Sequence, residues 1–288
     1  MTAFNHEVGE KLREIAALLK AQRANPFRYQ AYLHAADTLD NLTEDLDDLV
    51  QIKGMKGLTD LPAIGSGIAQ SIYEYVATGR MTRLENLQGE SDPVGLFQSI
   101  PTVGRTLAQR IHESLHVDTL ESLENATRNG QLDKVEGLGA KRKEAIEAWL
   151  LKRFGERRQP LRQGPQSSLI PVRLLLKVDT EYRSKAAAGK LPLITPKRFN
   201  PENKAWLPIL HTTYEHWHFT ALFSNSERAH KLDHIFDWVI IYFSDDNQRE
   251  GQHTVVTETH GSLLGKRVVR GREAECREYY QAAATLPP

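Results

Sequence analysis

The sequence predicts a multidomain protein in which an all-α N-terminal half with helix-hairpin-helix motifs is followed by an α+β C-terminal domain. Apolar residues recur at helical spacing up to about residue 155 and are interrupted by short turns. After residue 169, apolar and β-branched runs of strand length dominate. The 288 residues, 40% of them hydrophobic, suffice for two or three packed domains.

Residues 1–90 are expected to form one small helical domain. An apolar stripe at i, i+4, i+7 and i+11 predicts a helix over residues 6–20. The members of this stripe are Val8, Leu12, Ile15 and Leu19. Further helices are predicted over residues 26–42, with a proline in the first turn, over 46–52, and over the segment GSGIAQSIYEYVATG.

Three short turns each connect two predicted helices. They are the LPAIG turn (61–65), the IPTVG turn (100–104) and the VEGLG turn (135–139). A short turn that opens the second of two helices is the signature of a helix-hairpin-helix motif. The last two turns lie about 35 residues apart, so residues 91–155 are predicted to form a tandem helix-hairpin-helix domain.

These turns favour binding to DNA. Amides at the start of a helix lack an intrahelical acceptor, and the helix dipole adds partial positive charge, so a phosphate oxygen satisfies both. Because backbone amides make the contact, binding is expected to be independent of base sequence, to duplex, nicked or gapped DNA through its phosphate backbone. The residues expected to contact DNA are Gly65, Gly67, Gly104, Arg105, Gly137, Gly139, Lys141, Arg142 and Lys143.

The three turns are not equivalent. Ala63 and Thr102 replace the first glycine of the VEGLG turn, which restricts the backbone and is expected to hinder close approach of phosphate. The VEGLG turn is also followed by three consecutive basic residues. Cations there oppose the helix dipole at a cost of about 0.3–1 kcal/mol each, which a bound anion would offset. An alternative is that the turns only join packed helices or dock other proteins, as in a protein-interaction adaptor whose protein partners the sequence does not identify.

Charge is unevenly distributed along the chain. The whole chain has 37 Lys and Arg against 37 Asp and Glu, but residues 156–190 have eight against three. Residues 156–168, ERRQPLRQGPQSS, lack apolar periodicity and are predicted to form a basic linker. The DNA footprint is therefore expected to centre on the basic segment 152–162.

Residues 169–288 are expected to form an α+β domain of unknown function. The predicted strands are VRLLLKVD, WLPILHT, WHFTALFS, WVIIYFSD, HTVVTET and GKRVVRG. The segments TEYRSKAAAG, NSERAHKLD and REAECREYYQ are expected to be helical. The basic strand GKRVVRG could lie along phosphate. An equally good interpretation is a solvent-exposed edge strand that its charges protect from pairing. Trp206, Trp217, Phe219 and Trp238 are read as core residues rather than base-stacking platforms.

Residues 1–90 resemble the N-terminal helical domain of family X DNA polymerases, through RYQAYLHAADTL (28–39) and LPAIGSGIAQSIYEYVATGRMTRLENL (61–87). Residues 93–155 are similar to the second hairpin region of the bacterial members, through IPTVGRTLAQRI, TLESLENATRNGQL and VEGLGAKRKEAI. The resemblance covers about half of the chain and implies a setting in DNA repair.

The catalytic residues of that family are not found in this sequence. The family's polymerase palm needs a Gly-Ser turn and strand-borne carboxylates for two metal ions, whereas the paired acids here, 47–48 and 245–246, are adjacent and would point to opposite faces of a strand. The lyase lysine of the repair members is replaced by Ser71, and two supporting lysines by Arg28 and Gly67. The expectation is therefore a non-catalytic or catalytically diverged relative of that family, whose scaffold still touches a 5′ phosphate or a gap.

Histidines offer a second functional reading. The C-terminal domain holds seven of the 11 histidines, and His216 and His218 would share a strand face while His230 and His234 would share a helix face. No cofactor is predicted, but a divalent or transition metal at these residues would make the protein a metal-dependent nuclease or phosphoesterase acting on DNA. The single cysteine, Cys276, and the lack of an apolar run of roughly 20 residues favour a cytoplasmic protein without a membrane partner.

Overall fold

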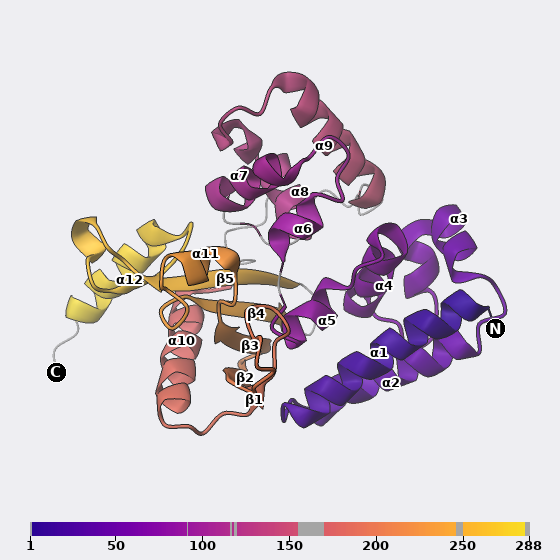
Figure 1. Ribbon diagram of the computed structural model, residues 1–288, viewed down its shortest axis with the longest axis horizontal. Coiled ribbons are helices and arrows are strands. Elements are labelled where there is room, and N and C mark those ends of the chain that lie inside the picture. Colours follow the sequence, from indigo (N-terminus) through magenta and orange to yellow (C-terminus); the bar gives the residue numbers. More distant parts are fainter. Residues whose placement is uncertain are drawn as a thin grey trace.

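The computed structural model describes residues 2–90, 92–115, 117, 120–154, 170–245 and 250–285. Its N-terminal half is helical, and its C-terminal part combines an antiparallel sheet with helices (Figure 1), which confirms the predicted fold class. The predicted linker at 156–168 lies outside the described residues.

The first part of the chain folds into packed helices. They are α1 (Ala3–Ala21), α2 (Pro26–Asp40), α3 (Leu46–Thr59), α4 (Ser66–Thr78) and α5 (Thr82–Leu87). The predicted stripe of α1 is completely buried, with Val8, Leu12, Ile15 and Leu19 each 0% exposed. Helix α3 continues past Ile52 because Gly54, at φ 58°, allows a kink rather than an end.

Residues 92–154, which we call the tandem module, form a second helical unit. Its elements are α6 (Pro93–Phe97), α7 (Arg105–Leu115), α8 (Leu120–Arg128), the 3₁₀ helix η1 (Gln131–Lys134) and α9 (Ala140–Phe154). Their apolar faces meet in one core, which includes Phe97, Ile100, Ile111 and Ile146. Leu120 also lines a cavity at the neighbouring sheet.

The C-terminal part is built on a six-stranded sheet whose strands follow the chain order and pair antiparallel with their neighbours. The strands are β1 (Leu193–Ile194), β2 (Leu207–Tyr214), β3 (Trp217–Phe223), β4 (Val239–Asp245), β5 (Glu250–Thr257) and β6 (Arg267–Val269). The helices are α10 (Val172–Ala187), α11 (Glu227–Lys231), the 3₁₀ helix η3 (Gly261–Leu263) and α12 (Glu273–Thr285).

One predicted strand is wrong: VRLLLKVD begins helix α10, which continues through the segment expected to be helical. Leu174, Leu175, Val178 and Tyr182 repeat at helical spacing and are buried, so the helix lays one apolar face on the sheet. A short apolar run fits either a buried strand or a buried helix by pattern, and only its length and packing distinguish them.

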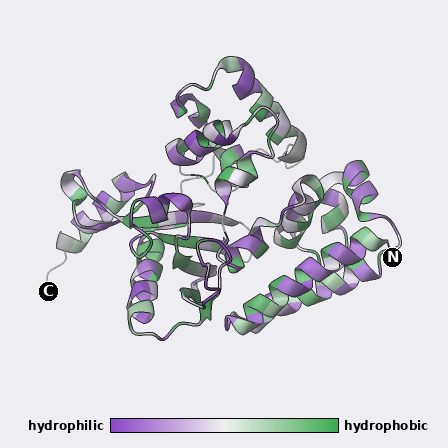
Figure 2. Ribbon diagram, in the orientation of Figure 1, coloured by the Kyte–Doolittle hydropathy of each residue, from purple (hydrophilic) through white to green (hydrophobic). Residues whose placement is uncertain are grey.

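The first helices and the C-terminal sheet share a continuous core. This cluster joins Leu12 and Leu39 to Ile194, Leu207 and Phe219. Figure 2 shows hydrophobic residues along the central strands and hydrophilic residues on outer parts of the helices. We call residues 2–90 and 170–285 together the main body.

Candidate nucleic-acid interface

The three turns have the same backbone geometry. Their third residues adopt left-handed conformations, with φ 58° at Ala63, 71° at Thr102 and 74° at Gly137. In each turn the fourth amide donates to the first carbonyl, at 3.3 Å in LPAIG, 3.1 Å in IPTVG and 3.3 Å in VEGLG. The expected restriction at the two non-glycine residues therefore does not change the turn.

The fourth residue of each turn anchors it in a core. Ile64, Val103 and Leu138 are 3%, 5% and 7% exposed. The glycine that follows accepts hydrogen bonds from amides one turn into the next helix, as when Arg142 and Lys143 donate to the Gly139 carbonyl at 3.0 and 3.1 Å. The amides at the very start of the helix have no intrahelical acceptor and are available to an anion.

The VEGLG turn is open to solvent. Gly137, Gly139, Lys141 and Arg142 are all exposed. A Cβ placed at Gly139 would meet no atom of the described residues within 4 Å, so a phosphate can approach the backbone closely. Lys143 is instead held in an ion pair with Asp133.

Arg110 belongs to this site although the sequence did not single it out. It lies on α7, and its Nη1 donates to the Glu136 carbonyl at 2.8 Å, within the VEGLG turn. A Cβ at Gly137 would come within 2.4 Å of the same nitrogen, so this glycine leaves room for the guanidinium. Arg110 therefore adds a cation to the VEGLG turn from the helix that follows the IPTVG turn. In the sequence, the signal for Arg110 was its place on the polar face of a predicted amphipathic helix.

The IPTVG turn is also exposed, but its first basic residue is engaged elsewhere. Thr102 and Gly104 are solvent-exposed, and a Cβ at Gly104 would meet no described atom within 4 Å. Arg105, the first residue of α7, is 3.1 Å from the Glu227 carboxylate on α11.

The LPAIG turn faces a groove rather than open solvent. Gly65 and Gly67 are half-buried and line this groove, whose opposite wall includes His218, Ser244 and Asp245 at the ends of β3 and β4. The predicted contacts of this turn are thus enclosed by the C-terminal sheet, unlike those of the other two turns.

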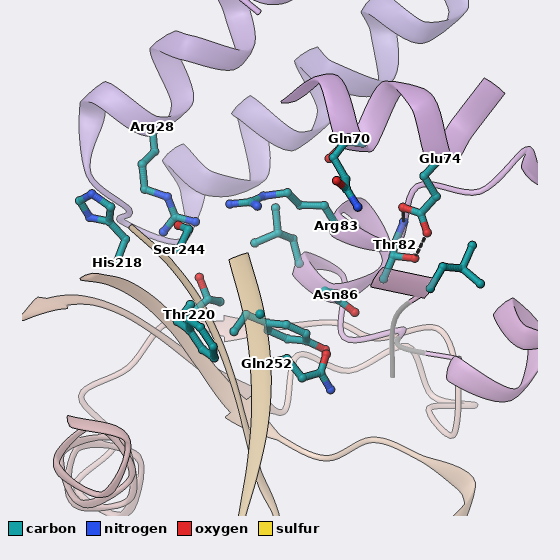
Figure 3. A pocket seen from close by; sticks show the side chains of 16 residues that line it. Arg28, Gln70, Glu74, Thr82, Arg83, Asn86, His218, Thr220, Ser244 and Gln252 are labelled. Carbon is teal, nitrogen blue, oxygen red and sulfur yellow. Dashed lines mark hydrogen bonds between the residues drawn. The ribbon is translucent and has the colours of Figure 1, made fainter. Parts of the chain in front are cut away.

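A cavity adjoins this groove between α2, α4 and α5 on one side and the sheet on the other (Figure 3). Arg28 and Arg83 project into it from the helices, opposite Thr220 and Gln252. Ser71 lines the cavity, and its hydroxyl donates to the Gly67 carbonyl at 3.2 Å.

Burial shifts two titratable groups beside the cavity. It raises the pKa of Glu74 to about 7, even though the carboxylate accepts from the Thr82 amide at 3.1 Å. Burial, and next the positive charges of Arg28 and Arg83, lower the pKa of His211 to about 3. His211 is therefore neutral, and its ring nitrogens lie 2.9 Å from Thr220 Oγ1 and 3.0 Å from Gln22 Oε1, which ties β2 to the end of α1.

The four candidate metal ligands do not converge. His218 Nδ1 is 3.1 Å from Thr213 Oγ1, while the His216 ring lies against Trp217. His230 and His234 were expected on one helix, but α11 ends at Lys231. Within the described ranges, no group of three or more His, Cys, Asp or Glu side chains is arranged to hold a metal ion.

The partners of these histidines are structural groups. His230 Nε2 is 2.7 Å from Asn225 Oδ1, and His234 stacks on Trp238.

The paired acids lie at the ends of secondary-structure elements. Asp47 and Asp48 lie in the first turn of α3, where carboxylates favour the helix dipole. Asp245 is 4% exposed at the end of β4, and Asp246 lies outside the described residues.

In the basic strand β6, Arg267 points inward rather than toward phosphate. Its guanidinium bonds Asp179 of α10 at 2.7 and 2.9 Å. Arg270 pairs with Glu258 at 3.1 Å, and the Lys266 ammonium lies over the Tyr280 ring.

The folded units match two families. Residues 3–81 match the helix-hairpin-helix domain, and residues 94–146 match the SAM-like helix-hairpin-helix tandem. The LPAIG turn lies in the first match, and the other two turns lie in the second. The N-terminal half thus consists of helix-hairpin-helix domains, and over about half its length the chain is homologous to family X DNA polymerases.

Two relatives illustrate this homology. DNA polymerase/3′-5′ exonuclease PolX of Bacillus subtilis (strain 168) is 29% identical over 175 residues, which make up 59% of this chain and 27% of that protein. DNA polymerase lambda of Arabidopsis thaliana is 25% identical over 159 residues, 54% of this chain and 29% of that protein. The matches thus span less than a third of either relative. Among the described helices, none combines the length and apolar character needed to cross a membrane.

Proposed function

We propose that the protein binds DNA through the phosphate backbone, without reading base sequence, and that the tandem module is its main contact surface. The observation that carries this proposal is the exposed VEGLG turn, whose helix-start amides are accompanied by Lys141, Arg142 and Arg110. Backbone donors and nearby cations are what a phosphate requires, and they carry no base information. The homology to polymerases supports a setting in DNA repair.

A salt titration tests this function. Replacing Lys141 and Arg142 by glutamine should weaken duplex binding similarly for unrelated sequences and reduce the slope of log K against log salt by about 1–2. Gly139→Pro should also weaken binding, because it removes a backbone donor. The matched control is glutamine at Arg173 and Lys177 of α10, which changes the same charge on the main body. Equal affinity and slope in the turn and control variants would argue against the proposal and favour a protein-docking role.

We also propose that the protein prefers nicked or gapped DNA. The cavity beside the LPAIG turn carries Arg28 and Arg83, whose positive potential contributes to lowering the pKa of His211. Such a recess suits a 5′ phosphate at a strand interruption. Gapped DNA with a 5′ phosphate should therefore bind more tightly than the same gap with a 5′ hydroxyl, and Arg28→Gln should abolish the difference. Equal affinity for the two gaps in the unmodified protein would rule out this preference.

A further inference from the structure

Helix α7 of the tandem module lies against α11 of the main body through reciprocal ion pairs. Arg105 Nη2 is 3.1 Å from Glu227 Oε2, and Arg228 Nη1 is 3.9 Å from Glu113 Oε1. Each helix therefore contributes one acid and one base to the junction. A cleft lined by residues of both helices, including Gln109 of α7, lies beside these pairs.

Further ion pairs continue this polar junction along the segment that enters the tandem module. Arg198 Nη1 is 3.2 Å from Asp92 Oδ1, and Lys197 Nζ is 3.9 Å from Glu90 Oε1. The module meanwhile has its own apolar core, separate from the core of the main body. Charged contacts thus contribute to holding two separately packed units together.

The Arg105–Glu227 pair is open to water. The two side chains are 71% and 41% exposed. Ion pairs at such exposure are weak and are screened by salt. Glu227 is nevertheless kept ionised, because Lys231 at 2.7 Å, together with Arg105, lowers its pKa. Because the exposed pair is weak, a phosphate that makes further contacts with the turn can displace this carboxylate from Arg105.

We propose that Glu227 is a built-in competitor for DNA: its carboxylate occupies Arg105 at the IPTVG turn, and a DNA phosphate must break this pair to bind there. Carboxylate and phosphate accept the same guanidinium donors, so the two are mutually exclusive partners of Arg105. Release of the pair removes one of the links that hold α7 to α11. This inference rests on the proposed function, since it concerns regulation of the same DNA-binding surface.

A double-mutant cycle tests the competition. Dissociation constants for a labelled duplex at low salt are measured for the unmodified protein, Glu227→Gln, Arg105→Gln and the double variant. Glu227→Gln should tighten binding about two- to fivefold, the range expected from the loss of one exposed ion pair. The same change in the Arg105→Gln background should have no effect. Glu202→Gln is the matched control because it removes an exposed carboxylate paired with a lysine, Lys204, elsewhere in the main body.

The outcomes separate this inference from the proposed function. Unchanged affinity of Glu227→Gln would overturn the proposal that Glu227 competes with DNA for Arg105. Equal tightening with and without Arg105 would also overturn it, because that result would reflect net charge or the freed Lys231. Tightening by Glu202→Gln of the same size would also overturn it. Failure of the unmodified protein to bind any duplex would refute the proposed function and this inference with it.

Discussion

Thr102 adopts a left-handed backbone conformation, with φ 71°, in the IPTVG turn. A β-branched residue is strained there because its Cβ approaches neighbouring backbone atoms, and such strain costs on the order of 1–3 kcal/mol. The buried Val103 and the hydrogen bond from its amide to Ile100 hold the turn in place. The packing of the turn therefore imposes a conformation that residue 102 does not favour.

Relief of this strain gives the first prediction. Thr102→Gly should raise the free energy of unfolding of the tandem module by about 1 kcal/mol while leaving duplex binding intact. Urea denaturation monitored by circular dichroism measures the change. Thr106→Gly, in the first turn of α7 where the backbone is helical, should instead lower stability. Destabilisation by Thr102→Gly as well would show that the turn is not strained.

Glu74 gives a pH prediction. Burial raises its pKa to about 7 from an ordinary value of 4.5, so between these values the folded protein retains a proton that the unfolded chain has lost. The free energy of unfolding should therefore fall as pH rises from about 4.5 to 7, by about 3 kcal/mol from this residue. Between pH 5 and pH 8, the free energy of unfolding of Glu74→Gln should fall less than that of the unmodified protein. The exposed Glu278→Gln should leave the fall unchanged, and an unaltered profile for Glu74→Gln would contradict the assignment.

At the scale of elements, Arg267 joins β6 to α10. Its guanidinium bonds Asp179 twice, and Asp179 is only 1% exposed. A third contact reaches Asp237 Oδ1 at 2.7 Å. Removing Arg267 would leave the buried Asp179 carboxylate uncompensated, so this arginine is needed to fix the helix on the sheet.

Loss of one partner should therefore be costly. Arg267→Gln, which leaves the buried Asp179 carboxylate without this cation, should lower the free energy of unfolding by about 3–5 kcal/mol. Arg173→Gln, which removes an exposed ion pair with Glu215, should cost less than about 1 kcal/mol. Thermal denaturation of the two variants makes the comparison, and similar midpoints would show that the Asp179 pair does not stabilise the fold.

At the scale of the whole molecule, two separate cores divide the chain. The core of the main body joins the first helices to the C-terminal sheet, far away in sequence, whereas residues between them form the core of the tandem module. The chain thus leaves one packed unit after α5, builds another, and returns to the first at α10 (Figure 1).

The two cores should respond separately to mutation. Phe97→Ala removes a fully buried ring from the tandem module and should destabilise that unit by about 3–5 kcal/mol. Hydrogen exchange should then accelerate over residues 94–150 and remain slow in the sheet. Leu12→Ala should do the reverse, since Leu12 lies in the core of the main body. Uniform acceleration across both units in either variant would show that they unfold as one.

Local features could be predicted from the amino-acid sequence: the stripe of α1, the turns at 61–65, 100–104 and 135–139, and five of the six strands. These depend on periodicity and turn chemistry within a few residues. Three other features depend on long-range packing. VRLLLKVD is helical, Arg110 contacts the VEGLG turn, and Arg105 pairs with Glu227, 122 residues further along the chain. A short apolar run or an exposed arginine has no preferred partner among its sequence neighbours. Its role therefore depends on which distant surface the packing of the two cores brings against it.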